Sequence, residues 1–229
     1  MSRLRLESAG VVVETTDGPL EVLAPTTLDL VEDRVALVGP NGSGKSTIAR
    51  LLNGLVEATT GRVLLDDLDV ARHGREVRRR VGFVFTDPAA QLVMPTAAED
   101  VALSLRRTHR DKAVRRRVAE DVLAAHGLAG LGDRSVHALS GGQRQLLALA
   151  GVLATDPDVL VADEPTTLLD LANARRVGDL LLGLRQQLVL VTHDLDLAAR
   201  CDRALLVDGG RVVADGAAGE VVAHYRATA

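Results

Sequence analysis

The stretch that decides the fold is Gly39-Pro40-Asn41-Gly42-Ser43-Gly44-Lys45-Ser46, which matches the phosphate-binding pattern G-x-x-x-x-G-K-[ST] without a gap. It stands between a short apolar run, residues 35–38, and a segment with helical spacing. Glycines here let successive backbone N–H groups turn toward a phosphate, which a Cβ atom would obstruct. The stretch therefore predicts a nucleoside-triphosphate site, with Lys45 at the β- and γ-phosphates, Ser46 on Mg²⁺, and Thr47 beside them at the helix start.

The segments around this stretch alternate between strands and helices. Apolar runs at residues 81–85, 159–162, 188–191 and 204–207 predict buried strands. A helical stretch near residues 171–184 separates two of them, an order that favours parallel pairing. Residues 4–37 predict short strands joined by turns, and residues 96–154 show helical spacing. We expect one α/β domain over residues 1–229, with a helical subdomain inserted at about residues 87–154.

Composition limits the functions open to the chain. Its 229 residues are 47% hydrophobic and 25% charged, as in an ordinary globular protein. The net charge of −4 argues against nucleic acid as a partner. One cysteine, Cys201, excludes an internal disulfide framework and favours a reducing compartment. No apolar run is long enough to span a bilayer, and the first residues lack the apolar region of a signal peptide.

Two acids end the apolar run at residues 159–162. Asp163 would stand at the carboxyl edge of a strand, where it suits a contact with Mg²⁺ through water. Glu164 would lie next to the γ-phosphate and polarise the attacking water as a general base. Taken alone, both acids could simply cap the following helix; with the phosphate-binding stretch upstream, the catalytic interpretation is favoured.

Two further motifs carry a family resemblance. One is Leu139-Ser140-Gly141-Gly142-Gln143, and the other is Val191-Thr192-His193-Asp194. With the phosphate-binding stretch and the Asp163-Glu164 pair, in this order, they resemble the ATP-binding-cassette (ABC) ATPase family over essentially the whole chain. The resemblance implies a P-loop NTPase (RecA-like) core with a parallel sheet, an N-terminal antiparallel β subdomain and the inserted helical subdomain.

The resemblance also implies an active assembly of two domains, either two copies of this chain or one copy and a paralogue. In this family two domains pack head to tail and enclose two ATP molecules. Ser140, Gly141, Gly142 and Gln143 of one protomer would face the γ-phosphate held by the other. His193 would contact the γ-phosphate in its own protomer, either as a donor or by orienting Glu164, and Asp170 would lie in the loop that passes between the two sites.

The stretch from Val81 to Leu103 looks like the ATPases of energy-coupling-factor importers, which take up vitamins and transition metals. It contains the elements V-F-x-D-P-x-x-Q-L, P-T and E-D-V-A. This resemblance, to the biotin, cobalt and nickel branches first, implies a transmembrane coupling subunit and a substrate-binding membrane component. It also implies a place at the cytoplasmic face of the membrane and a groove near residues 86–99 for a helix of the coupling subunit.

The chain departs from the family pattern at two places. Thr86 stands where the family has a glutamine that contacts Mg²⁺, so we expect its shorter side chain to reach the ion through a water. Gln91 belongs to the second half of the same loop and is not expected to replace it. No aromatic residue precedes Phe83, so Val11 or Val13 would offer adenine an apolar face.

Other interpretations remain open at this level. The chain could be a soluble ABC ATPase without a membrane partner, as in cofactor assembly, or a nucleotide-responsive module that hydrolyses poorly. The basic clusters at residues 72–80 and 106–117 are typical of solvated helix faces. Anionic lipid headgroups are the next interpretation of these clusters. Nucleic acid comes third, because no aromatic residue is interleaved for base stacking.

Overall fold

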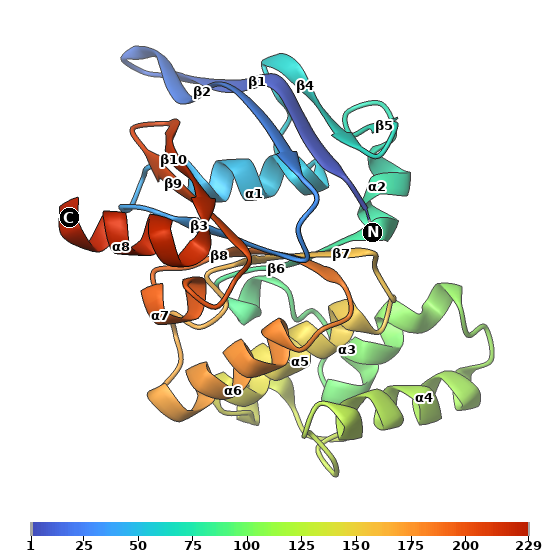
Figure 1. Ribbon diagram of the computed structural model, residues 1–229. Helices are drawn as coiled ribbons and strands as arrows, with labels where there is room; N and C mark the ends of the chain where they lie inside the picture. The colour runs from blue at the N-terminus through green and yellow to red at the C-terminus, as the bar shows by residue number, and fades with distance from the viewer. Residues whose placement is uncertain (1, 229) are drawn as a thin grey trace. The chain divides into compact units, whose positions relative to one another are not determined.

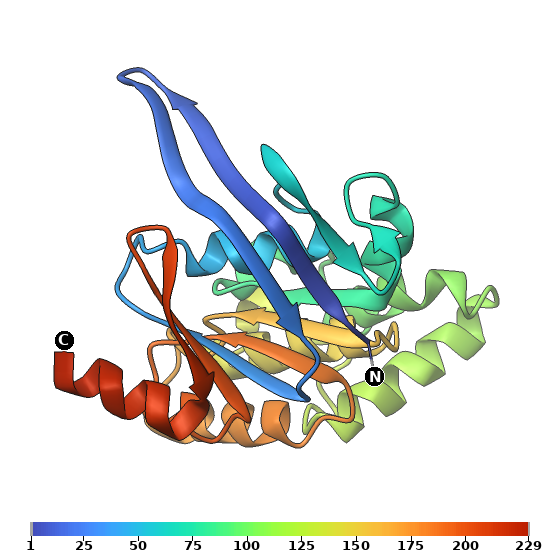
Figure 2. The ribbon, with the colours of Figure 1, turned by 45° about the horizontal axis from the view of Figure 1, so that its top comes forward.

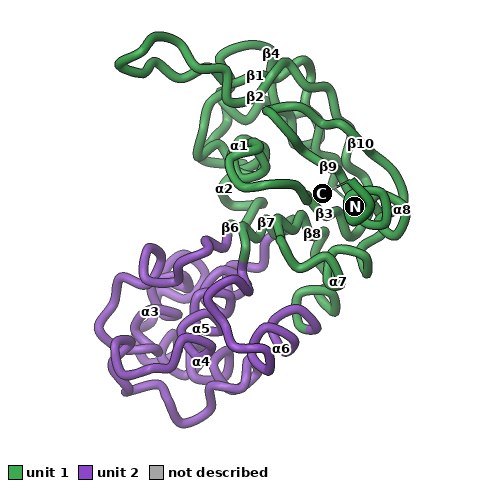
Figure 3. Tube along the Cα trace, turned by 90° about the vertical axis from the view of Figure 1, so that its left-hand side faces the viewer, with its two compact units in different colours: residues 1–83, 158–164, 180–229 green, residues 84–157, 165–179 purple. Residues whose placement is uncertain are grey.

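The computed structural model describes residues 2–228, which form two compact units. Within the described residues, the first unit comprises residues 2–83, 158–164 and 180–228, and the second comprises residues 84–157 and 165–179 (Figure 3). The second unit contains residues 87–154, the stretch expected as a helical insert, extends to residues 84 and 157, and also includes residues 165–179. The organisation into a single ABC ATPase domain stays a prediction.

The first unit contains an antiparallel sheet with the strand order β2-β1-β4-β5. Its strands are β1 (Leu4–Thr15), β2 (Gly18–Leu30), β4 (Thr60–Leu65) and β5 (Leu68–Asp69). A tight turn closes the β1–β2 hairpin, with Thr15 opposite Gly18. The hairpin extends beyond its neighbouring strands (Figure 2). Leu4 and Leu6, two residues apart on β1, are fully buried, as expected for one face of a half-buried strand.

The second sheet has the order β10-β9-β3-β8-β7-β6. Its strands are β3 (Arg34–Val38), β6 (Val81–Val84), β7 (Val159–Asp163), β8 (Gln187–Val191), β9 (Arg203–Asp208) and β10 (Arg211–Ala217). Strands β7, β8, β3 and β9 pair in parallel, and the β7–β8 pairing is the one that the helical stretch between them predicted. Val191 pairs with both Leu37 and Asp163, so three strands end at the same level. The loops that follow them therefore meet at one edge of the sheet.

Helix α1 (Lys45–Asn53) lies between the two sheets and contacts strands of both (Figure 1). Its apolar residues Ile48, Leu51 and Leu52 are buried there. Gly54 ends the helix in the left-handed conformation, with φ of 71°, and its N–H bonds to the last turn. The other helices of this unit are α2 (Gly74–Arg80), α7 (Leu195–Ala198) and α8 (Ala218–Thr228).

The second unit is helical, as the spacing in residues 96–154 predicted. It contains α3 (Ala97–Ser104), α4 (Lys112–Ala125), α5 (Gly141–Leu153), the start of α6 (Leu171–Leu182), and the short 3₁₀ turns η1 (Pro88–Ala90), η2 (Leu105–Arg107) and η3 (Val136–Ala138). Val101, Leu123 and Leu146 from three of these helices are buried and form its core. Within residues 2–228, no helix combines the length and the hydrophobicity that a bilayer crossing requires.

Candidate functional site

The phosphate-binding loop follows β3, and its glycines adopt conformations that other residues resist. Gly39 has φ of 140°, and a Cβ atom there would lie 2.0 Å from the Val207 carbonyl oxygen on β9. Gly44, the residue before α1, has φ of 105° and passes close to the Val22 carbonyl. The loop passes so close to the strands that a side chain at Gly39 would clash, and the positive φ of Gly44 would strain any residue with a side chain.

The Ser43 side chain shows that the loop is shaped for a polar ligand. Ser43 is 3% exposed, and its hydroxyl oxygen is buried with no hydrogen-bond partner among residues 2–228. A buried hydroxyl without a partner costs free energy, about 1–3 kcal/mol. Phosphate oxygens would satisfy it, so the residues present fit a bound phosphate group.

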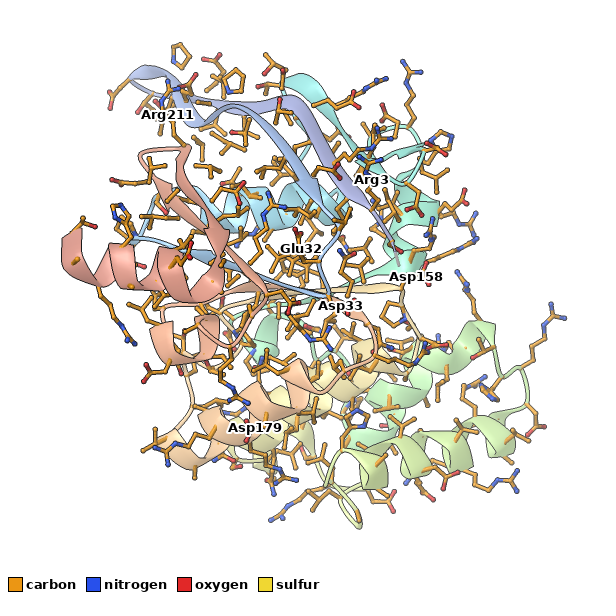
Figure 4. All side chains as sticks on the ribbon, in the orientation of Figure 1. Arg3, Glu32, Asp33, Asp158, Asp179 and Arg211 are labelled. Atoms are coloured by element: carbon orange, nitrogen blue, oxygen red, sulfur yellow. The ribbon has the colours of Figure 1, made fainter. Side chains whose placement is uncertain are left out.

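The β9–β10 turn braces this loop from outside. The N–H of Gly210 donates to the Ser43 carbonyl oxygen at 2.9 Å, and the Ala24 N–H on β2 donates to the Gly210 carbonyl at 2.9 Å. Beside the turn, Arg211 Nη2 lies 3.6 Å from Glu21 Oε1 on the β1–β2 hairpin (Figure 4). The sequence pattern did not reveal this brace, because the three segments are far apart in the chain.

Lys45 is the first residue of α1 and is only 4% exposed. Its ammonium donates to the carbonyl oxygens of Gly39, at 2.9 Å, and Pro40, at 2.7 Å. Burial lowers the pKa of Lys45, while the negative charges of Glu164 and Asp163 oppose that shift. The ammonium is thus held over the loop, where a phosphate would replace the carbonyls as its partner.

Ser46 and Asp163 bring two oxygen atoms together. Ser46 Oγ donates to Asp163 Oδ1 at 2.8 Å, and Arg50 Nη2 lies 3.6 Å from Asp163 Oδ2. Asp163 is 1% exposed, and this burial raises its pKa, while the Ser46 hydroxyl and the Arg50 charge work in the opposite direction. A hydroxyl and a carboxylate are hard oxygen ligands of the kind that Mg²⁺ prefers. The pair therefore fits Mg²⁺.

The side chains of Glu164 and His193, from the loops that follow β7 and β8, contact each other. Glu164 Oε1 lies 2.8 Å from His193 Nε2, and the two side chains are 17% and 37% exposed. Glu164 has φ of 51°, a left-handed conformation that is strained for a residue with a side chain. Its N–H donates to the Val191 carbonyl at 2.9 Å, which holds it in place. The arrangement resembles a general base oriented by a second side chain.

The loop after β6 belongs to the second unit. Thr86 is half-buried there, and its role toward Mg²⁺ stays a prediction. The amide of Gln91 is engaged at both ends: its Oε1 accepts from the Phe85 N–H at 3.3 Å, and its Nε2 donates to the Ala148 carbonyl on α5 at 3.2 Å. These bonds tie the loop to α5.

The Ser140–Gln143 segment begins helix α5. The Gln143 N–H donates to Ser140 Oγ at 3.2 Å, and the Ser140 N–H donates to Gln143 Oε1 at 2.9 Å, forming a capping box. Gly141 and Gly142 occupy the first helical turn, where backbone N–H groups have no partner within the helix. This helix start can therefore accept an anion.

Asn173 connects this helix start to the loop that contains Asp170, and the sequence did not single it out. A Cβ atom on Gly142 would lie 2.5 Å from Asn173 Cγ. Asp170 accepts from the Asn173 backbone N–H at 2.9 Å and from its side-chain amide at 2.8 Å. These bonds lower the pKa of Asp170. Its carboxylate thus caps α6; the predicted place of Asp170 at the nucleotide stays a prediction.

The two candidate contacts for adenine differ in exposure. Val11 is 3% exposed and therefore has no free face, whereas Val13, opposite Leu20 on the hairpin, is 41% exposed. A contact between Val13 and adenine stays a prediction.

Comparisons with known proteins identify the family of the chain. Residues 26–167 match the family described as "ABC transporter". The chain is 43% identical over 223 residues to "Biotin transport ATP-binding protein BioM" of Rhizobium etli, which covers 97% of each chain.

Two solved structures have the same fold. The first is cbiO1 from Clostridium perfringens, described as part of the ABC transporter complex cbiONQ, with a TM-score of 0.83, 30% identity, and coverage of 98% of this chain and 92% of that one. The second is a dimeric structure of the ATP-binding cassette MJ0796 in a post-hydrolysis state, bound to ADP and Pi, with a TM-score of 0.84, 28% identity, and coverage of 94% and 98%. The predicted α/β P-loop NTPase fold is confirmed, and the chain belongs to the ABC transporter family as an ATPase.

Proposed function

We propose that this chain is the ATPase subunit of an ABC importer of the energy-coupling-factor type, which carries a vitamin such as biotin or a transition metal ion. The observation that carries the catalytic part is the Glu164–His193 contact of 2.8 Å, at the same sheet edge as the phosphate-binding loop. The 43% identity to a biotin transport ATP-binding protein supports the importer assignment.

Each group at the sheet edge has a role in hydrolysis of ATP. The loop N–H groups, Ser43 Oγ and Lys45 hold the phosphates, and Ser46 with Asp163 would hold Mg²⁺, which supplies charge neutralisation at the β- and γ-phosphates. Glu164 accepts a proton from a water molecule as the water oxygen attacks the γ-phosphorus. The bond between the γ-phosphorus and the bridging oxygen breaks, and ADP and inorganic phosphate are released. His193 orients the Glu164 carboxylate through their contact.

A second protomer would complete the site. The start of α5 has unpaired backbone N–H groups and no acidic residue in its first turn, so it suits the γ-phosphate held by the partner. The cassette MJ0796, whose chain matches this one with a TM-score of 0.84, is described as dimeric, which supports an assembly of two protomers. Closure on two ATP molecules and opening after hydrolysis would then supply the movement that drives transport.

A groove in the second unit suits the helix of a transmembrane coupling subunit. It measures about 470 Å³ and lies between α3 and α4. Ala98, Ala102 and Leu103 give it apolar walls, while Glu99 and Arg116 bring charges to it. An amphipathic helix fits such a groove through its apolar face. We place the chain at the cytoplasmic face of the membrane, together with this subunit and a substrate-binding membrane component.

Affinity purification of the tagged chain from its native membranes in mild detergent, followed by mass spectrometry, tests the importer assignment. Recovery of a multi-helix membrane subunit supports it, and a companion binding protein would reveal the class of solute. Ala102→Glu, which places a charge on the groove wall, should abolish this recovery and leave ATP binding intact. Recovery of the chain without any membrane protein would contradict the importer assignment and favour an ABC ATPase without a membrane partner.

A further inference from the structure

A cavity of about 300 Å³ lies in the first unit at the end of α1 that is farther from the phosphate-binding loop. Residues from the end of α1, from β4 and from the segment that includes β5 and α2 line it. Figure 1 shows α2 and β5 at this end of α1. Helix α1 separates the cavity from Lys45 by its whole length, about 13 Å at the usual rise per residue. The cavity is therefore distinct from the nucleotide site.

The floor of the cavity is apolar. Leu51, Val63 and Val70 contribute to its lining and are 1%, 5% and 4% exposed. These side chains come from α1, β4 and the segment after β5, so the floor belongs to the packed core of the unit. Val56, Ala58 and Ala71 also line the cavity and are half-buried or exposed, so a ligand seated here would cover their apolar surface in addition to any polar contact.

The rim of the cavity carries arginines that have no acidic partner. Arg72, Arg75 and Arg78 line it, and none of the three forms an ion pair or side-chain hydrogen bond with residues 2–228. Arg80, the last residue of α2, behaves differently, because its guanidinium is paired with both Asp66 and Asp158 at 2.6 Å. The basic cluster at residues 72–80 thus contains one arginine held by two ion pairs, Arg80, and three arginines gathered at the cavity, while Arg79 does not line the cavity.

The acidic residues at the cavity do not neutralise the charges of Arg72, Arg75 and Arg78. Asp69 Oδ1 accepts from the N–H groups of Ala71, at 3.0 Å, and Arg72, at 3.1 Å, and so shapes the turn before α2. Glu57 is exposed at the rim. A fourth lining arginine, Arg62, is paired with Glu7 at 2.6 Å. The unpaired guanidiniums therefore leave a net positive charge beside an apolar floor.

The position of Arg78 is set by two glycines. A Cβ atom on Gly74 would lie 2.9 Å from Arg78 Nη1, and one on Gly54 would lie 3.8 Å from the same atom. The guanidinium therefore lies across the space between the end of α1 and the start of α2. This placement leaves its donors available to a ligand, since no carboxylate holds them.

We propose that this cavity is a second ligand site, which binds a phosphate monoester or diester carried on a small apolar body. Arg75 and Arg78 bind the phosphate oxygens through charge-assisted hydrogen bonds, a role for which the planar guanidinium is well suited. The apolar body lies on Val56, Ala58 and Ala71. The phosphate could belong to a free organic phosphate or to the headgroup of an anionic lipid, and the chemistry of recognition is the same for both.

Titration calorimetry of the full chain with phenyl phosphate tests the proposal, with MgADP present in excess so that the phosphate-binding loop is occupied. We expect Arg75→Ala and Arg78→Ala each to weaken binding about tenfold or more, the loss expected for one charge-assisted hydrogen bond. The matched control is Arg79→Ala, which removes the same charge from the same helix at a residue that does not line the cavity. It should keep the affinity within about twofold of the wild type.

Flotation with vesicles of phosphatidylcholine, with and without phosphatidylglycerol, distinguishes a lipid headgroup from a free organic phosphate as the source of the bound phosphate. A lipid headgroup as ligand predicts flotation only with the anionic vesicles, lost in Arg75→Ala and Arg78→Ala but kept in Arg79→Ala. A free organic phosphate predicts calorimetric binding without flotation. Equal losses in all three variants would show diffuse charge attraction and would overturn the proposal. Unchanged binding in the two cavity variants, or no binding of either probe, would overturn it as well.

Discussion

At the scale of single residues, the site depends on polar groups whose partners are set by burial. Asp163 is buried beside Ser46 and Arg50, and Glu164 holds a left-handed backbone next to His193. Both carboxylates follow one strand, yet their environments differ, since Asp163 is almost fully buried and Glu164 reaches the solvent-facing side chain of His193. This difference suits one carboxylate to a metal ion and the other to proton transfer.

The first residue-scale prediction concerns Glu164→Gln. The amide keeps the shape and a hydrogen bond to His193 but cannot accept a proton, so hydrolysis of ATP should fall about 100-fold or more, while ATP binding is retained. Phosphate release and equilibrium binding of a fluorescent ATP analogue measure the two effects. As a control, Glu57→Gln, an exposed residue outside the site, should hydrolyse at the wild-type rate. Wild-type turnover in Glu164→Gln would exclude Glu164 as the base.

The second residue-scale prediction concerns how the stability of Asp163→Asn, compared with the wild type, depends on pH. Burial raises the pKa of Asp163, so the folded chain holds this proton more tightly than the unfolded chain does. Its contribution to stability is therefore present at low pH and is lost as the pH rises through the folded pKa. Near neutral pH, Asp163→Asn should raise the free energy of unfolding by about 1 kcal/mol while abolishing Mg²⁺-dependent hydrolysis.

Denaturant unfolding at a series of pH values from about 3, below the ordinary Asp pKa, up to about 8 measures this difference. The gain of Asp163→Asn over the wild type should shrink as the pH falls. The exposed Asp121→Asn serves as the control and should leave both stability and hydrolysis unchanged. A variant that loses stability at neutral pH would contradict the account of Asp163 as a destabilising buried charge.

At the scale of elements, loops and helix ends carry the function and strands position them. The register brings the ends of β3, β8 and β7 together, and α1 buries its apolar residues between two sheets. In the second unit, Asn173 fills the space that the missing side chain of Gly142 leaves. Gly142 at the start of α5 and Asn173 on α6 thus allow the two helices to pack closely at this point.

This fit predicts the behaviour of Gly142→Ala. The added Cβ atom would lie 2.5 Å from Asn173, whose amide is held by Asp170, so the variant should lose about 1–3 kcal/mol of stability and most of its hydrolysis. Adding Asn173→Ala should restore much of both losses, measured against Asn173→Ala alone. Gly219→Ala, where a Cβ atom meets nothing, is the control for a glycine replaced without contact. If the double variant instead shows the sum of the two single variants' losses in stability, a clash between the new Cβ atom and Asn173 is not the cause.

At the scale of the whole molecule, the site of one chain is incomplete in the proposed mechanism, because the start of α5 would serve the partner's nucleotide. Mixing two inactive variants tests this. Lys45→Ala removes the phosphate-binding ammonium, and Ser140→Arg places a cation at the helix start, where the dipole opposes it. In a head-to-tail pair, a mixed dimer has one doubly defective site and one intact site.

Equal mixing should therefore recover about a quarter of the wild-type rate, since half of the dimers are mixed and each has one intact site of two. Phosphate release after co-refolding or prolonged exchange of the two variants measures this recovery. Each variant mixed with itself is the control and should stay inactive. If the mixture stays inactive while mixed dimers are present, the Ser140 segment does not act on the partner's nucleotide.

Much of the molecule could be predicted from the chain alone. The Gly39–Ser46 pattern, the apolar strand before Asp163, and the position of His193 are local in sequence, and each depends on chemistry that few other residues supply. Hydrophobic runs also indicated the parallel strands, because strands buried on both faces are apolar throughout. These features determined the fold class and the phosphate-binding and catalytic candidates.

The tertiary structure alone decided which distant residues meet. Arg50 at Asp163, Gly210 at Ser43 and Asn173 at Gly142 are contacts between segments that no local pattern links. The basic cluster at residues 72–80 looked uniform, yet folding paired Arg80 with Asp66 and Asp158 and left Arg75 and Arg78 at a cavity. The physical reason is that local spacing determines which side chains share a face, whereas partners and cavities depend on how strands far apart in the chain pair and pack.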